Sequence, residues 1–144
     1  MPWRVVGWNP HGAWPAAPPP FALPPPLRAG AQPAGLRLSV PAQLRIARLL
    51  YGLCVAFIAG GWPGATPNDT AFFEAATAEL ELDNALLVAF GSTRKAGGSA
   101  ASDALTQALV DAGTEYICIV AKSHDRHVTD ALRTTLDENL AMVT

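Results

Sequence analysis

Residues 55–64 have the sequence Val-Ala-Phe-Ile-Ala-Gly-Gly-Trp-Pro-Gly, an apolar run that ends in a glycine-rich turn. Two further apolar runs, Leu86–Phe90 and Tyr116–Val120, each precede a polar turn. The centres of the three runs are Phe57, Leu87 and Ile117, which are 30 residues apart. Because the runs are almost entirely apolar rather than alternating, they predict parallel strands that are covered on both faces.

Helical patterns surround these strands. We predict a first helix with Ser39 as N-cap, Pro41 in its first turn and an apolar face made of Ile46, Leu49, Leu50 and Leu53. A second helix is expected to open at Asn68 or Asp69 and to share a face among Phe73, Ala76 and Leu80. A third helix is expected to open at Ser102 and to end at Gly113, with an apolar face made of Leu105, Ala108, Leu109 and Ala112. A final helix is expected to carry Val128, Leu132, Leu136 and Leu140.

The spacing favours a partial (β/α)₈ barrel. A βα unit of roughly 30 residues, repeated eight times, gives the roughly 250 residues of such a barrel. The chain has 144 residues, so we expect about three βα units and one helix before them. An open doubly wound sheet is the alternative, because periodicity does not separate the two α/β architectures.

The N-terminal part has a different composition. Eleven of the 13 prolines and three of the four tryptophans lie in residues 1–41, and no Asp or Glu precedes Asp69. We expect residues 1–26 to be a polyproline II or disordered leader, and residues 27–144 to form the barrel-like domain. Pro26-Leu27-Arg28 resembles the end of a proline-rich ligand motif, but a solvated tail or an extension upstream of the natural start is the preferred interpretation.

The overall composition excludes several classes of protein. Half of the residues are apolar and the net charge is −2, which favours a globular core and gives no indication of nucleic-acid or membrane binding. Cys54 and Cys118 cannot form a disulfide framework. No run approaches 18 apolar residues and the N-terminus lacks a signal-peptide pattern, so we predict a cytoplasmic protein.

Candidate functional groups follow the three strands, since α/β proteins place their chemistry at the carboxyl ends of the strands. These segments are 59–64, 91–95 and 122–127, and together they could bind an anionic carboxylate. Each has a simpler interpretation. Residues 60–64 could be a tight turn, and Ser92 and Thr93 could cap the next turn rather than bind a carboxylate. His124 and His127 could face solvent rather than bind a metal, Lys122 could be a solvated lysine and Cys118 a core residue. No Ser-His-Asp or Cys-His set is recognisable.

Several motifs resemble the citramalate synthase and 2-isopropylmalate synthase family. Residues 27–32, Leu-Arg-Ala-Gly-Ala-Gln, are similar to the L-R-D-G-x-Q segment that ends the first barrel strand of this family. Residues 57–64 resemble the I-E-G-G-W-P-G motif of the citramalate branch. The likeness continues through 43–50, 68–73, 89–94, 122–129 and 132–140, so it covers about 118 residues, from Leu27 to the C-terminus.

The resemblance implies a metal-dependent acyltransferase. Family members condense acetyl-CoA with a 2-oxo acid, which is pyruvate in the citramalate branch leading to isoleucine and branched-chain amino acids. A divalent Mg²⁺ or Mn²⁺ polarises the ketone. By position, Arg28 is the catalytic arginine that stabilises the developing alkoxide, and Gln32 is a substrate-side polar group.

Two carboxylates of the family are replaced. The metal-binding aspartate falls on Ala29 and the glutamate of the second strand falls on Ala59, while the H-x-H metal ligands belong to a later strand that we expect this chain not to reach. Mg²⁺ and Mn²⁺ are bound mainly by oxygen ligands, so we expect no metal ligand and no cofactor for this chain. The prediction is a truncated citramalate-synthase-like chain that is inactive alone. The alternatives are a non-enzymatic degenerate fragment or association module, or a 2-isopropylmalate-synthase-like lineage. A homo-oligomer or pairing with another barrel fragment could cover the open edges of the chain.

Overall fold

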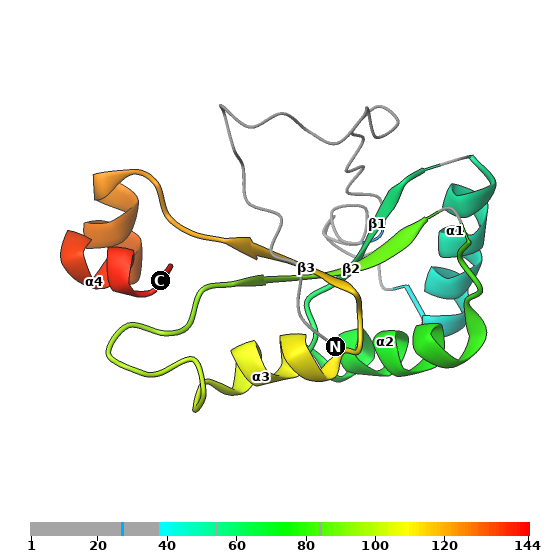
Figure 1. The fold of residues 1–144 in the computed structure, drawn as a ribbon, viewed down its shortest axis with the longest axis horizontal. Helices are drawn as coiled ribbons and strands as arrows, with labels where there is room; N and C mark the ends of the chain where they lie inside the picture. The colour runs from blue at the N-terminus through cyan, green and yellow to red at the C-terminus, as the bar shows by residue number, and fades with distance from the viewer. Residues whose placement is uncertain (1–26, 28–37, 54, 84) are drawn as a thin grey trace.

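A computed structural model of the chain describes Leu27 and residues 38–53, 55–83 and 85–144 (Figure 1). The helices are α1 (Val40–Gly52), α2 (Pro67–Glu79), α3 (Ala104–Asp111) and α4 (Leu136–Ala141), with a π-helical segment η1 (His127–Leu132) before α4. The strands are β1 (Phe57–Gly61), β2 (Leu86–Ser92) and β3 (Tyr116–Val120). The predicted leader, residues 1–26, lies outside the described residues.

The three strands form one parallel sheet in the order β1-β2-β3. Phe57 pairs with Leu86 at the start of β1, and Val88 pairs with Tyr116 at the start of β3. The register shifts by one residue between Ala59 and Gly61, where β1 bulges. The predicted strands are therefore confirmed, with β1 extended through its two glycines and β2 extended to Ser92.

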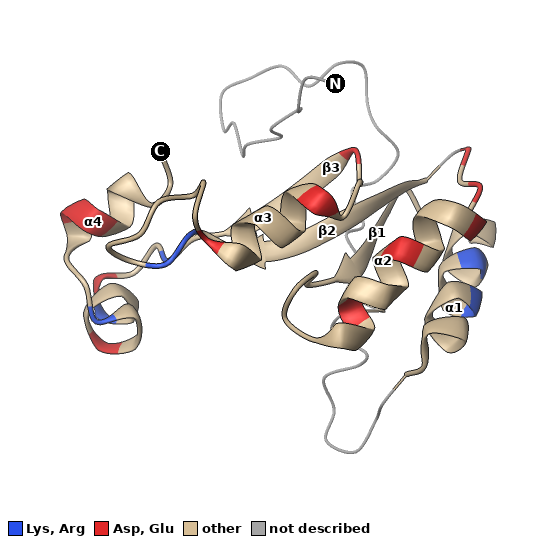
Figure 2. Cartoon of the chain, turned by 90° about the horizontal axis from the view of Figure 1, so that it is seen from below, with Lys and Arg blue, Asp and Glu red and all other residues tan. Residues whose placement is uncertain are grey.

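The helices α2 and α3 lie on the same face of the sheet (Figures 1 and 2). Helix α2 packs on β1, α3 packs on β2, and α1 packs beside α2. An open doubly wound sheet would reverse its strand order and carry helices on both faces. The described part of the chain has three sequential strands with these connecting helices on one face, an arrangement shared by a barrel wall and by one half of a doubly wound sheet.

The core lies between the helices and the sheet. Its buried residues are Leu27, Leu44, Ala47, Ile58, Phe72, Phe73, Ala76, Ala85, Ala89 and Leu109. The rings of Phe72 and Phe73 meet edge to face with centroids 5.3 Å apart. Glycines in the strands let the helices approach closely, because a Cβ on Gly60 would lie 2.6 Å from the ring of Phe72. The α/β class expected from the sequence is thus confirmed.

The predicted apolar face of α1 is wrong in part. Ser39 is the N-cap as expected, but α1 buries Gln43, Leu44 and Ala47. Leu49 and Leu53 are instead 68% and 74% exposed. The helix carries two apolar stripes, and only the one that faces α2 and β1 is covered by the described residues.

Two helix starts differ by a few residues from the expectation. Helix α2 begins after Thr66, whose hydroxyl accepts a hydrogen bond from the Asp69 backbone N–H, rather than at Asn68 or Asp69. Helix α3 begins after Asp103, rather than Ser102, and the Asp103 carboxylate accepts from the backbone N–H groups of Leu105 and Thr106. Aspartate takes the capping role because its side chain reaches both unpaired donors.

The predicted final helix is two segments. Arg133 adopts a left-handed conformation with φ 54°, which ends η1, and α4 restarts after the N-cap Thr135. A β-carbon disfavours this conformation within a helix, so the apolar spacing of Leu132 and Leu136 does not belong to one continuous helix.

Candidate functional site

The candidate segments lie at the carboxyl ends of the strands, as predicted. η1 and α4 lie beyond the ends of β2 and β3 (Figure 1). In the first segment, residues 59–64, β1 runs to Gly61 and a structured turn follows: the Gly64 backbone N–H donates to Thr70 Oγ1 at 3.1 Å, and Gly64 has φ 81°. A Cβ on Gly64 would lie 2.7 Å from Ala108. These contacts support the tight-turn interpretation.

Trp62 extends from this turn against β2. Its ring meets Phe90 edge to face, with centroids 6.4 Å apart. The indole Nε1 is buried and donates to no acceptor among the described residues. The ring contact with Phe90 gives Trp62 a packing role against β2.

The second segment contains a long-range ion pair. Arg94 Nη1 donates to Glu138 Oε1 at 2.7 Å, and their side chains are 14% and 28% exposed. The same oxygen accepts the Gly97 backbone N–H at 2.8 Å. The Gly97 N–H, and then the Arg94 guanidinium, lower the pKa of Glu138 below its usual value. The Arg94 side chain therefore joins α4 to the loop after β2.

Ser92 and Lys95 also have local partners. Ser92 Oγ donates to the Thr93 carbonyl oxygen at 3.1 Å. The Lys95 backbone N–H donates to Asp103 Oδ2 at 3.1 Å. Backbone donors of Thr106 and Lys95 lower the pKa of Asp103.

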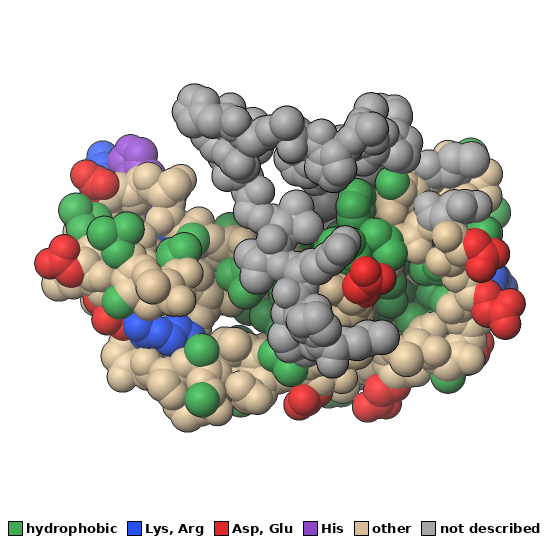
Figure 3. Space-filling view, in the orientation of Figure 1, with side chains coloured by type: hydrophobic (Ala, Val, Ile, Leu, Met, Phe, Trp, Pro, Cys, Tyr) green, Lys and Arg blue, Asp and Glu red, His purple; other side chains and the backbone are tan. Residues whose placement is uncertain are grey.

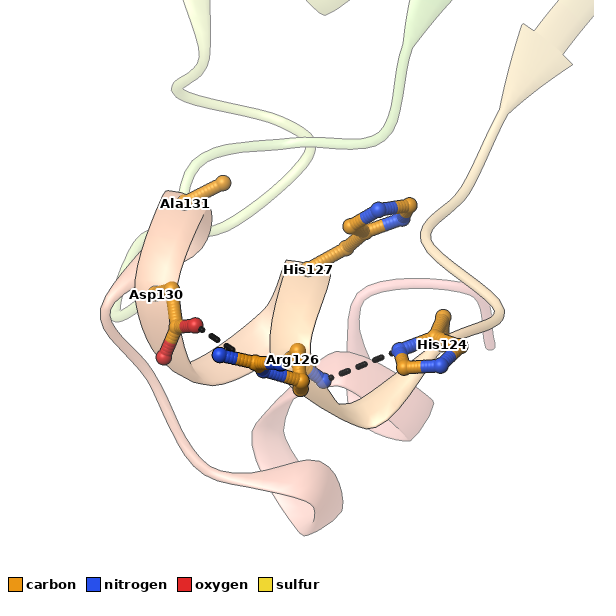
Figure 4. Close-up of a pocket in the computed structure, with 5 residues that line it drawn as sticks. All are labelled: His124, Arg126, His127, Asp130 and Ala131. Carbon is orange, nitrogen blue, oxygen red and sulfur yellow. Dashed lines mark hydrogen bonds and ion pairs between the residues drawn. The ribbon is translucent and has the colours of Figure 1, made fainter.

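The third segment forms an open depression lined by His124, Arg126, His127, Asp130 and Ala131 (Figure 4). The two imidazole centroids are 5.3 Å apart, and His124 Nδ1 accepts the Arg126 backbone N–H at 3.2 Å. Both histidines are exposed, and Figure 3 shows histidine atoms at the surface of the end of the molecule that carries η1 and α4. This agrees with the solvent-facing interpretation.

Lys122 fits its simpler interpretation, whereas Cys118 is not one of the buried core residues that were expected to include it. The Lys122 side chain is exposed, while its backbone carbonyl accepts from Asn139 Nδ2 at 3.0 Å. Cys118 is half-buried in β3.

The residues transferred from the family resemblance are only partly placed. Arg28, Gln32 and Ala29 lie outside the described residues. Ala59 is placed: it lies in β1, 4% exposed, and presents a methyl group where the family has a glutamate.

The sequence did not predict Glu138 as a functional partner. Thr135 and Glu138 are spaced as in a capping box, and Thr135 Oγ1 does accept the Glu138 backbone N–H at 3.1 Å. That spacing could have identified the helix start. The Glu138 carboxylate, however, turns to Arg94 and Gly97 instead of its own helix.

The described residues contain no group of three or more His, Cys, Asp or Glu side chains arranged to hold a metal ion. They likewise contain no helix with both the length and the apolar character needed to cross a membrane.

Comparison with known proteins identifies relatives, although no protein-family model matches the chain. An (R)-citramalate synthase of Streptomyces coelicolor is 60% identical over 117 residues, which are 81% of this chain and 22% of the relative. (R)-Citramalate synthases of Synechocystis and Aquifex aeolicus are 47% and 44% identical over the same length, 21% and 22% of those proteins. The chain therefore spans about a fifth of the length of these relatives. Over that shared segment, this chain belongs to the citramalate synthase family.

Proposed function

We propose that this chain supplies the N-terminal βα units of a citramalate-synthase-type (β/α)₈ barrel. The 60% identity over 117 residues carries this proposal. The fold supports it, because parallel strands in sequential order with α2 and α3 on one face form the arrangement from which a barrel wall is built. The barrel would carry the family reaction, the condensation of acetyl-CoA with a 2-oxo acid. Pyruvate is favoured as that acid because the relatives named above are citramalate synthases.

We also propose that this chain does not catalyse the condensation alone. Ala29 and Ala59 carry methyl groups where the resemblance expects carboxylates, and the described residues offer no metal-binding group. Arg28 and Gln32 are the proposed contacts to the developing alkoxide and to the substrate. Without ligands for a divalent ion, Arg28 would be left as the main positive charge near the ketone.

The first experiment measures release of the coenzyme A thiol from acetyl-CoA, with pyruvate and Mn²⁺ present. We expect no turnover by this chain alone, with the S. coelicolor relative as the active control. Turnover by this chain above the enzyme-free rate would overturn the proposed inactivity.

A chimera tests the family assignment itself. The matched segment of the S. coelicolor relative is replaced by the corresponding segment of this chain, with and without the double substitution Ala29→Asp and Ala59→Glu. We expect thiol release only from the doubly substituted chimera. An inactive but folded double-substituted chimera would argue against a barrel-wall role for this segment.

A further inference from the structure

The loop after β2 holds a shielded arginine at the carboxyl end of the sheet. Arg94 follows β2 by two residues, and β2 is the central strand of the described sheet. The side chains of Arg94 and Glu138 are 14% and 28% exposed, whereas the other two ion pairs of the described residues have side chains that are more than half exposed. Shielding a charged pair from water costs desolvation energy that the exposed pairs avoid. The Arg94–Glu138 pair is therefore less hydrated than the others.

One nitrogen of the Arg94 guanidinium makes all of its hydrogen bonds to the described residues. Nη1 donates to Glu138 Oε1 at 2.7 Å and to the Lys95 carbonyl oxygen at 3.2 Å. Among the described residues, the buried side-chain nitrogen without a partner is Trp62 Nε1, so Arg94 Nε and Nη2 are accessible to solvent. These two nitrogens carry one of the forks of N–H donors that match two oxygens of a carboxylate or a phosphate.

Glu138 fixes the orientation of this fork. Its Oε1 accepts from Arg94 Nη1 and also from the Gly97 backbone N–H at 2.8 Å. Its own backbone N–H donates to the Oγ1 of Thr135, the N-cap of α4, at 3.1 Å. The carboxylate is thus bound to the loop after β2 at one end and belongs to the first turn of α4 at the other. Two segments far apart in sequence therefore hold the guanidinium by its Nη1 corner and leave the opposite side free.

We propose that Arg94 binds an oxyanion of a substrate through Nε and Nη2, and that Glu138 is the positioning residue that orients it. The site lies at the carboxyl end of a parallel sheet, where α/β proteins bind their ligands. This inference rests on the proposed function, whose two substrates both carry oxyanions: the carboxylate of pyruvate and the phosphates of acetyl-CoA. Glu138 does not occupy the fork, because its bonded oxygen contacts Nη1.

The test titrates the full chain with pyruvate or with coenzyme A at constant ionic strength and follows the Arg94 Nε–H signal by heteronuclear NMR. We expect a saturable shift with at least one of the two. Arg94→Lys, followed at the Gly97 backbone amide, should weaken binding by about tenfold, because an ammonium keeps the charge and lacks the fork. Lys95→Gln is the matched control. It removes a positive charge from an exposed side chain one residue away and should bind like the wild type.

Substitutions of Glu138 test the positioning role. Glu138→Ala should weaken binding although it removes a negative charge, because Nη1 loses its acceptor. Glu138→Gln keeps an acceptor oxygen and should recover part of the lost affinity. Asp137→Ala removes the same charge from an exposed neighbouring position in the first turn of α4 and should bind like the wild type. Far-ultraviolet circular dichroism confirms that each variant is folded, and Arg94→Lys remains decisive if a Glu138 variant is not.

Three outcomes would overturn the inference: no saturable shift with either compound, an equal loss of affinity in Lys95→Gln and Arg94→Lys, or tighter binding by Glu138→Ala, which would show that the carboxylate only repels the anion. A response to pyruvate alone supports the inference with a carboxylate as the ligand, and a response to coenzyme A alone supports it with a phosphate. Binding without thiol release in the chimera would support the oxyanion site and count against the proposed reaction instead.

Discussion

At the scale of single residues, close helix–sheet packing depends on glycines in strands. Gly60 lies against the rings of Phe72 and Phe73, where an added Cβ would approach to 2.6 Å and 2.9 Å. Both rings are almost fully buried, so neither can move away without displacing other core atoms. We expect Gly60→Ala to lower the free energy of unfolding by about 1–3 kcal/mol, measured by urea denaturation.

Gly52 provides the matched control for that substitution. It is the last residue of α1, and a Cβ there would meet no atom within 4 Å. Gly52→Ala should leave stability unchanged or raise it slightly, because alanine loses less backbone entropy in a helix. Equal effects of the two substitutions would show that close helix–sheet contact is not what requires Gly60.

Glu138 gives the fold a dependence on acid pH. Its pKa is lower in the folded chain than in the unfolded chain, chiefly through the Gly97 N–H and then through Arg94. The ionised carboxylate therefore stabilises the fold above the usual glutamate pKa of about 4.3, and this contribution is lost as pH falls below it. The stability difference between wild type and Glu138→Gln should be largest at neutral pH and shrink on acidification.

Arg94→Gln separates the two causes of that dependence. The Gly97 N–H is the larger cause of the lowered Glu138 pKa. In the Arg94→Gln background, the stability difference produced by Glu138→Gln should therefore still shrink on acidification, but by a smaller amount. Unfolding curves across the acidic range measure the stability difference between wild type and Glu138→Gln, and the same difference between Arg94→Gln and the double variant. A difference that does not vary with pH would show that the carboxylate gains nothing from its partners. The pair itself was not predictable, since 44 residues separate Arg94 and Glu138.

At the scale of elements, the caps decide where helices begin. The sequence predicted that a helix would open near Ser102, but Asp103 is the N-cap because its carboxylate accepts from Leu105, Thr106 and Lys95. We expect Asp103→Ala to cost about 1 kcal/mol of stability. Asp103→Asn should fall between that variant and the wild type, because an amide oxygen can cap α3 while the amide nitrogen cannot accept from Lys95. Thermal and urea unfolding of the three proteins would contradict this if Asn and Ala were equivalent.

The elements also show what apolar periodicity can and cannot predict. The three strands were predictable because each is a compact apolar run followed by a glycine-rich or polar turn, and only the ends of β1 and β2 differ from expectation. The buried face of α1 was not predictable in the same way. Leu44 and Ala47 form one apolar stripe and Leu49 and Leu53 form another, and the sequence alone does not say which stripe has a neighbour. The break at Arg133 also escaped prediction, since no glycine or proline marks it.

At the scale of the whole molecule, the fold was more predictable than the site. A 30-residue repeat of strand and helix predicts a parallel α/β sheet, because parallel strands need a crossover of about this length, but it does not distinguish a barrel from a doubly wound sheet. The candidate site depends on Arg28 and Gln32, which lie outside the described residues, and on side chains whose partners are distant in sequence.

The arrangement of the sheet predicts a gradient of local stability. Strand β2 pairs with a neighbour on each side and lies under α3, whereas β3 pairs only with β2 among the described residues. Beyond the sheet, η1 and α4 are joined to the rest of the fold through Arg94 and Lys122. Segments with fewer buried contacts open at lower free energy. Amide hydrogen exchange should therefore be slowest in β2, faster in β3 and fastest in η1 and α4. Uniform exchange across these segments would mean instead that the C-terminal helices unfold together with the sheet, so that the Arg94–Glu138 contact joins them into one cooperative unit.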